Sequence, residues 1–240
     1  MTVFEKLQRH YDHVISIYGE KAVVGVFLYG SQNYQCATED SDVDTKCILV
    51  PNLWHLAIEP YKTVERHVAE EHCECMTISH MIANFKKQNI NFLEILFTDY
   101  KIVNPIYEDL WNSLRTYRES IARYDPYAAI KSIGCQALHT IRQNPMDAKK
   151  IANGYRLYEF LVRYSKDIPY CECLIPSPEC LQTIMALKRG ERQPVFQDSE
   201  FLLSMIDALL QKDWAFEKMD IDDILNNYIL SFIERRISLD

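Results

Sequence analysis

The sequence predicts an α+β fold in which a small mixed β-sheet domain, residues 1–100, is followed by a helical domain, residues 101–240. Two observations lead to this prediction. Strand-like segments rich in β-branched and aromatic residues occur before residue 80, whereas helical spacing dominates afterwards. The 240 residues, of which 48% are hydrophobic, are enough to fill a sizeable core, so we expect the chain to fold by itself.

The first predicted elements are a helix and a buried strand. Apolar residues recur at helical spacing from residue 4 to residue 18, and Gly19 follows where this helix should end. The run from Ala22 to Tyr29 is continuous and rich in valine and aromatic residues, which favours a fully buried strand. It leads directly into Gly30-Ser31, where we expect a turn.

Two further strands are predicted before the helical half. Val43–Val50 follows a polar turn and has the composition of a second strand. Val68–Ile78 is interpreted as a third strand, in which alternation places Cys73 and Cys75 on the face opposite Glu74.

Helical patterns account for most of the remaining chain. The clearest interruption is Ile168–Pro178, which contains three prolines and two cysteines and is predicted to be a loop. The predicted helical segments lie near residues 79–97, 106–121, 126–143, 146–165, 178–189, 198–212 and 221–236.

Composition excludes several classes of protein. A net charge of −8 argues against a protein that coats nucleic acid non-specifically, although a local basic groove is compatible with it. No apolar stretch approaches the ~20 residues of a membrane-spanning helix, so no membrane partner is expected. The first residues lack the apolar core of a signal peptide, and the eight cysteines are therefore expected to be reduced thiols of a cytoplasmic protein.

The chemical prediction rests on two features near the end of the first strand. Gly30 lets the backbone approach a ligand closely, and the Ser31 hydroxyl with nearby N–H groups can bind phosphate oxygens. About ten residues later, Asp42 and Asp44 stand two apart in a strand, so both carboxylates project from one face. Each feature alone is common in turns, but in this order they favour a phosphate and metal site.

Paired carboxylates on a rigid strand suit Mg²⁺, with Mn²⁺ as a substitute, because these ions prefer oxygen ligands and bind substrate phosphates as well. A third carboxylate usually completes such a site. We assign this role to Glu74 on the neighbouring strand, with Glu70 and Glu71 as alternatives. Asp42, Asp44 and Glu74 are thus the predicted catalytic residues and metal ligands.

The segment GSQNYQCATEDSDVDTKCILVP resembles the signature of the DNA polymerase beta-like nucleotidyltransferases. Within that superfamily it is most similar to the branch that includes the RNA-ligase-associated nucleotidyltransferases of bacteria and phages. Gln35 departs from that branch, which usually has glycine at this place. Later similarities, in the same order as in the branch, are Asn91, Leu93, Glu94, Leu96 and Phe97, then Lys149, Lys150, Arg156 and Leu157, then Lys188-Arg189-Gly190-Glu191.

The resemblance implies a mixed sheet with flanking helices and a magnesium-dependent transfer of a nucleoside monophosphate from a nucleoside triphosphate to a hydroxyl acceptor. The acceptor is left open between an RNA or DNA end, a protein and a small molecule. Two alternatives on the same fold are an antitoxin-like regulator and a non-catalytic nucleotide-binding protein. A third carboxylate that faces the metal would distinguish the enzyme from the non-catalytic protein.

Substrate-binding roles are predicted for Gly30, Ser31, Tyr34, Lys46, Lys149 and Arg156. Tyr34 is placed to stack on a base or to border the sugar. Lys46 shares the face of the aspartates and is interpreted either as a phosphate ligand or as a salt-bridged lysine. Lys149, Arg156 and Arg163 repeat every seven residues, so they form either a phosphate-binding stripe or a solvated face. Glu94 is interpreted as a core carboxylate paired with one of these basic residues.

Overall fold

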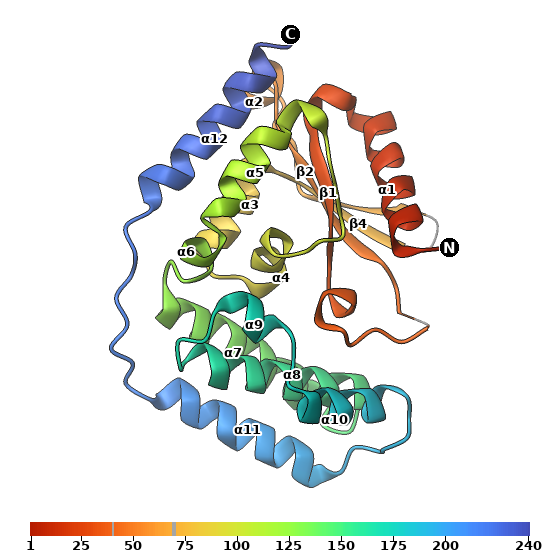
Figure 1. Cartoon of the computed structure of the whole chain (residues 1–240), viewed down its shortest axis with the longest axis vertical. Coiled ribbons are helices and arrows are strands. Elements are labelled where there is room, and N and C mark those ends of the chain that lie inside the picture. The colour runs from red at the N-terminus through yellow and green to blue at the C-terminus, as the bar shows by residue number, and fades with distance from the viewer. Residues whose placement is uncertain (40, 69–70) are drawn as a thin grey trace.

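The computed structural model describes residues 1–39, 41–68 and 71–240 and confirms the α+β fold class. Its centre is one mixed sheet with the strand order β3-β4-β2-β1-β5 (Figure 1). The β2–β4 pair is parallel, and the other three pairs are antiparallel. The strands are β1 (Val23–Tyr29), β2 (Asp44–Leu49), β3 (Val64–Val68), β4 (Glu71–Thr77) and β5 (Lys101–Val103).

Helix α1 (Val3–Tyr18) covers one face of the sheet, as Figure 1 shows. Thr2 and Glu5 form a capping box at its start, and Gly19, with a φ of 79°, ends it as predicted. The apolar side of the helix places Leu7 and Val14 against the sheet residues of this face.

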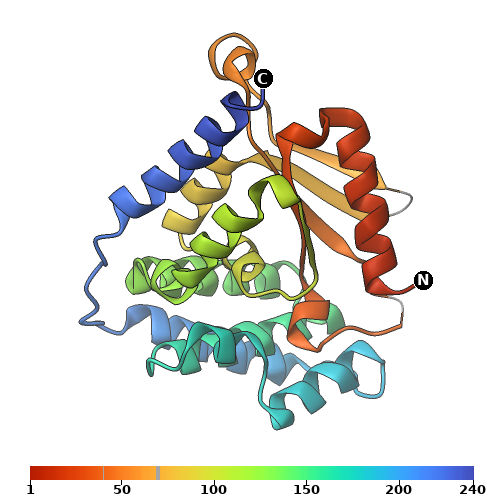
Figure 2. The same cartoon turned by 45° about the horizontal axis from the view of Figure 1, so that its top comes forward.

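The opposite face is covered by α3, α5 and α12, and a separate layer of helices lies beyond the end of β1 (Figures 1 and 2). That layer consists of α7, α8, α10 and α11, which pack on one another. The helices after α1 are α2 (Leu53–Ala57), α3 (Ile78–Lys86), α4 (Ile90–Leu93), α5 (Glu108–Thr116), α6 (Arg118–Ala122), α7 (Pro126–Gln143), α8 (Ala148–Tyr164), α9 (Tyr170–Leu174), α10 (Pro178–Lys188), α11 (Phe196–Gln211) and α12 (Asp222–Ile237).

One hydrophobic core joins the second face of the sheet to the helical layer. Trp111 of α5 packs on Phe27 of β1, with ring centres 4.1 Å apart. After α11 the chain returns to the sheet, where α12 contacts α3 and α5. The core therefore continues across the boundary predicted near residue 100.

Several short elements were not predicted. β3 has three consecutive polar residues, Glu65, Arg66 and His67, at the sheet edge, and β5 has only three residues, so neither has a strong sequence pattern. The predicted loop at 168–178 contains the short helix α9, whose first two N–H groups, of Tyr170 and Cys171, donate to the Glu119 carboxylate. A contact distant in sequence thus stabilises the start of this helix.

Across the parts of the chain that the structure describes, the helices are all too short or too polar to cross a membrane.

Candidate active site

The predicted turn after β1 is present and has an unusual backbone. Gly30 has a φ of 92°, a conformation that residues with a side chain rarely adopt. A single 3-10 turn, Ser31–Tyr34, follows, and Gln35 closes it with a φ of 59°. Gln35 is therefore in the left-handed region that glycine adopts most easily, so the replacement of glycine noted in the sequence leaves the left-handed turn in place.

Glu94 holds this turn from the core side. The Gly30 N–H donates to its Oε2 atom at 3.0 Å, and the Asn33 side-chain amide donates to the same atom at 3.3 Å. Glu94 is fully buried, and burial raises its pKa to about 7 even though hydrogen bonds from Tyr34 and Gly30 favour the charged form. Glu94 is the core carboxylate that was predicted, but its hydrogen-bond donors Gly30 and Asn33 lie in the turn, and neither is a basic side chain.

Asp42 and Asp44 flank the buried side chain of Val43, which packs under α1. Asp44 is the first residue of β2 and pairs with Tyr29, the last residue of β1, so the acidic pair lies beside the Gly30 turn. Burial raises the pKa of Asp44, and the neighbouring Asp42 carboxylate raises it further, while His72 and Lys149 lower it.

A cavity of about 610 Å³ opens in front of the two aspartates. It is lined on the sheet side by the Ser31 turn and on the helical side by the start of α8 and the end of α10. The lining residues that matter here are Ser31, Asp42, Asp44, Lys149 and Lys188. The aspartates of one half of the fold therefore face lysines of the other half.

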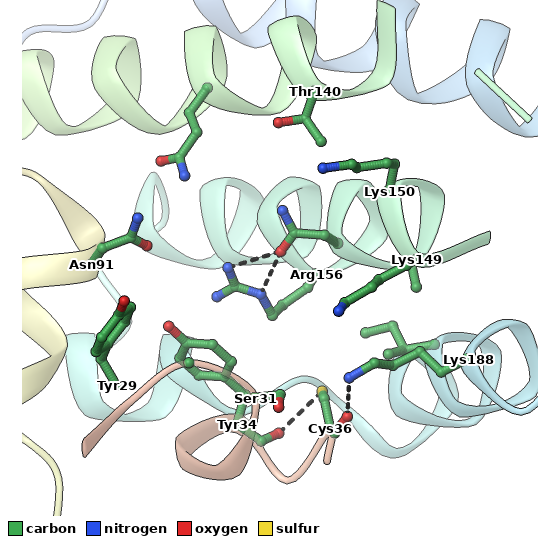
Figure 3. Close-up of a pocket in the computed structure, with 15 residues that line it drawn as sticks. Tyr29, Ser31, Tyr34, Cys36, Asn91, Thr140, Lys149, Lys150, Arg156 and Lys188 are labelled. Atoms are coloured by element: carbon green, nitrogen blue, oxygen red, sulfur yellow. Dashed lines mark hydrogen bonds between the residues drawn. The ribbon is translucent and has the colours of Figure 1, made fainter. Parts of the chain in front are cut away.

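A second cavity of about 350 Å³ continues from the first and shares Ser31, Lys149 and Lys188 with it. Figure 3 shows Lys149, Lys150, Arg156 and Lys188 pointing into this space from α8 and α10. Uncharged amides from Asn91, Gln136 and Asn153, together with the Tyr29 ring, line the remaining wall. The two cavities thus form one cleft with an acidic end and a cationic end.

Arg156 forms the floor of the cationic end. Its side chain is only 8% exposed, and its Nε and Nη2 atoms donate to Asn153 Oδ1 at 3.1 and 3.0 Å. The guanidinium lies 4.0 Å from the centre of the Tyr34 ring. Its Nη1 atom is buried and has no hydrogen-bond partner within the described part of the chain. A buried, unpaired cationic donor at a cavity wall is suited to binding an anion.

Lys188 contributes a second, half-buried cation. Its Nζ atom donates to the carbonyl of Cys36, which ties α10 to the loop after the Ser31 turn. Burial lowers the pKa of Lys188, and the positive charges of Lys149 and Arg156 lower it further. In the sequence, Lys188 belongs to a segment that resembles the family but has no predicted role in the site. Its proximity to Ser31 arises only from the packing of α10.

The other predicted phosphate ligands have different positions. Lys46 does share the face of Asp44, but it is 2% exposed and its Nζ atom lies 4.1 Å from the Tyr29 ring centre and 4.2 Å from that of Phe92. It forms an ion pair with Glu74. The salt-bridged alternative describes Lys46 in this structure. Tyr34 lines the cationic cavity but is 4% exposed and stacks on Arg156, so its ring supports the cavity floor.

Neither Glu74 nor Glu71, two of the candidates for the third carboxylate, lines the cavity of Asp42 and Asp44. Glu74 projects from the same face as Lys46, to which it is bound, and does not line the cavity of the aspartates. Glu71 points to the other side, where Lys6 and Arg9 of α1 pair with it. Glu70 lies outside the described residues.

The basic stripe of α8 divides in the fold. Lys149 and Arg156 line the cleft, as predicted, whereas Arg163 donates to the Ile175 carbonyl at 2.7 Å and stabilises the segment after α9. The Arg189 and Glu191 side chains lie 3.9 Å apart around Gly190, which has a φ of 73° and ends α10.

The donor set at the acidic end fits Mg²⁺. Asp42 is exposed, Asp44 is half-buried, and the Ser31 and Ser41 hydroxyls line the same cavity, so the available ligands are hard oxygen atoms. Burial raises the pKa of Asp44 and the Asp42 carboxylate raises it further, so a bound cation would favour the ionised form of Asp44.

No protein-family model matches this chain, and a search of curated proteins finds no match. The functional interpretation therefore rests on the arrangement of side chains in the cleft and on the sequence resemblance.

Proposed function

We propose that this protein is a magnesium-dependent nucleotidyltransferase that transfers a nucleoside monophosphate from a nucleoside triphosphate to a hydroxyl acceptor. One observation carries the proposal: the acidic pair and the cationic cavity meet at Ser31, Lys149 and Lys188. A triphosphate that spans this junction would place its charges against the lysines and Arg156, and its reacting phosphate beside Asp42 and Asp44.

The residues divide into three roles. Tyr29 and the amides of Asn91 and Gln136 border the base and ribose. Arg156, Lys149 and Lys188 neutralise the phosphates, and the Gly30–Ser31 turn allows the backbone to approach them. Asp42 and Asp44 hold the cation. Bound Mg²⁺ supplies charge neutralisation at the phosphate oxygens and lowers the pKa of the attacking hydroxyl.

In the proposed reaction, the acceptor oxygen forms a bond to the α-phosphorus while the bond from that phosphorus to the bridging oxygen breaks. Pyrophosphate leaves with the negative charge, which Lys149 and Lys188, at the junction of the two cavities, are placed to balance. The acceptor proton passes to solvent. The acceptor itself, whether an RNA or DNA end, a protein or a small molecule, must approach from the open side of the acidic end.

The test is incubation of the purified protein with each α-phosphate-labelled ribonucleoside triphosphate, Mg²⁺ or Mn²⁺, and a mixed RNA pool. Label in acid-insoluble RNA or in the protein supports nucleotidyl transfer and identifies the base and acceptor class. The double variant Asp42→Asn/Asp44→Asn should abolish incorporation. Asp213→Asn, an exposed carboxylate in the segment between α11 and α12, is the matched control and should leave incorporation unchanged.

A second candidate is a non-catalytic nucleotide-binding protein, which includes the antitoxin-like regulators of the same fold. The observation in its favour is the ion pair of Glu74 with Lys46. The described carboxylates that line the cavity are Asp42, Asp44 and Asp147, and Asp147 caps the start of α8, so no described part of a neighbouring strand supplies a third metal ligand. Metal-dependent triphosphate binding without incorporation into RNA, protein or small hydroxyl compounds would support this candidate over the enzyme.

A further inference from the structure

The hairpin of β3 and β4 carries a cluster of metal-binding side chains outside the cleft. Alternation along β4 places Cys73 and Cys75 under α1, as predicted. His72 lies on the opposite, open face, together with Glu65 and His67 of β3. This is also the face of Lys46 and Asp44, and His72 lowers the pKa of Asp44, but none of the three side chains lines either cavity of the cleft.

The three side chains converge closely. His67 and His72 are directly paired across the two strands, and Glu65 lies two residues before His67 on the same face. The His72 Nδ1 atom is 2.6 Å from Glu65 Oε1, and the two imidazole centres are 4.7 Å apart. One ligand atom from each of the three residues lies within 4.8 Å of the others.

We propose that Glu65, His67 and His72 bind a divalent transition-metal ion of the Zn²⁺ class. Two imidazoles and one carboxylate are ligands that this class prefers, whereas Mg²⁺ and Ca²⁺ prefer oxygen ligands alone. Three protein ligands also leave a coordination position open for water or another molecule. This metal is distinct in chemistry from the Mg²⁺ proposed for Asp42 and Asp44.

The geometry needs only a small adjustment. Ligand bonds of about 2.0–2.2 Å bring ligand atoms to within roughly 3.5 Å of one another, so a spread of 4.8 Å must contract by about 1 Å. Glu65 is 60% exposed and His72 is 41% exposed, so both side chains can move without disturbing the core. The backbone pairing of the hairpin already fixes their Cα positions.

A hydrogen bond between His72 and Glu65 is a simpler explanation of why these two side chains lie together. It does not involve His67, whose ring packs edge-on against His72. The metal site predicts that all three side chains contribute to binding, and this difference makes the proposal testable.

The experiment is a titration of the chelator-treated full-length protein with Zn²⁺ alone, followed by calorimetry. One ion should bind per chain, and His67→Ala, His72→Ala and Glu65→Gln should each weaken binding at least about tenfold. His13→Ala, a histidine on α1 away from this face, is the matched control and should bind as the parent does. Circular dichroism checks that each variant is folded.

Substitution with Co²⁺ identifies the ligand atoms. Nitrogen and oxygen ligation should produce visible absorption without the near-ultraviolet charge-transfer band of thiolate ligation. Thiolate absorption, or unchanged affinity in the His67 and His72 variants, would overturn the proposal.

The inference does not depend on the proposed function, and one variant separates the two. Asp42→Asn/Asp44→Asn should retain Zn²⁺ binding at the hairpin while losing the Mg²⁺-dependent activity. Loss of Zn²⁺ binding in that variant would place the ion at the aspartates and contradict the hairpin site.

Discussion

The two ends of the cleft are built in different ways. The carboxylates of the acidic end come from one short stretch of chain, because the Gly30–Ser31 turn follows β1 and the aspartates at 42 and 44 lie at the start of β2, which pairs with β1. The cationic end is assembled from α7, α8 and α10, which are distant in sequence from the turn. The difference shows that residues close in sequence can form the proposed metal site, whereas the proposed phosphate site needs the packing of separate helices.

Each end contains a partly buried group whose charged form is disfavoured. Burial and Asp42 raise the pKa of Asp44 at one end, and burial with Lys149 and Arg156 lowers the pKa of Lys188 at the other. Each end is therefore destabilised by its own like charges when no ligand is bound. In the proposed function, a bound metal ion offsets the unfavourable negative charge at the acidic end, and a bound polyphosphate offsets the unfavourable positive charge at the cationic end. Substitutions at the two ends should therefore affect different kinetic constants.

The largest expected effect is at the acidic end. Asp44→Asn should lower turnover by about 10³-fold or more, since loss of a metal worth several kcal/mol costs that much in rate. The same variant should raise the Tm of the metal-free protein by about 1–3 °C, because it removes a repelled, partly buried charge.

The pH dependence of this stabilisation has a definite sign. The pKa of Asp44 is raised in the folded state, so ionisation of Asp44 opposes folding above that pKa and has no effect once both states are protonated. The gain in Tm should therefore disappear as the pH falls through the acid range. A fall in Tm at neutral pH would show that Asp44 has a structural role instead.

The cationic end should control affinity and not turnover. Arg156→Met keeps an unbranched side chain of similar length but removes the guanidinium that lies over Tyr34, and with it the buried donor proposed to bind phosphate. Loss of a hydrogen bond to a charged group should raise KM for the triphosphate about 10–100-fold, with kcat changed only a few-fold. Steady-state kinetics measure the split, and Arg142→Met, an exposed arginine of α7, is the control. A fall in kcat with KM unchanged would contradict the division between the two ends.

Glu94 joins the two ends through the Gly30 turn, and its effect should appear in stability. Its pKa of about 7 in the folded state exceeds its ordinary value of 4.5, so the folded protein holds an extra proton between these values. The free energy of unfolding should therefore decrease as the pH rises from about 4.5 through 7.

Glu94→Gln should remove this decrease, because the amide oxygen still accepts from Gly30 but cannot ionise. At pH 8 the variant should be more stable than the parent by on the order of 1–2 kcal/mol, and at pH 5 the two should be similar. Urea unfolding at the two pH values measures the difference. Equal pH profiles would mean that Glu94 is already ionised in the fold.

The smallest expected effect is at Gln35. Gln35→Gly relieves a left-handed backbone that costs an L-residue roughly 1–2 kcal/mol, while the freer unfolded chain offsets about 0.5–1 kcal/mol. The free energy of unfolding should rise by about 0.5 kcal/mol with KM unchanged. Chemical denaturation and kinetics check both values. A large change in KM would mean that the glutamine side chain contacts the nucleotide.

The fold was largely predictable because its main elements have strong periodicity. α1, α7, α8, α10 and α12 match the predicted helices closely, and β1, β2 and β4 match the predicted strands. The missed elements are short or stabilised from outside: β5 is a three-residue strand at the edge of the sheet, and α9 is held by Glu119.

The site was predictable only in part. Alternation on β2 correctly placed Lys46 on the face of Asp44, but the sequence could not distinguish a phosphate ligand from the lysine that pairs with Glu74 between two aromatic rings. The convergence of Glu65, His67 and His72 could not be predicted, because β3 has no strand pattern in the sequence. They face one another only because β3 pairs with β4.

The sequence alone determined the turn, the acidic pair and the succession of the main strands and helices along the chain, because these depend on contacts within a few residues. Only the tertiary structure decided that Arg156 and Lys188 reach the Ser31 turn, that Glu94 holds that turn, and that Glu74 is bound to Lys46. Such contacts depend on how helices pack across the core, and packing is set by the shapes of many side chains together and not by a local pattern.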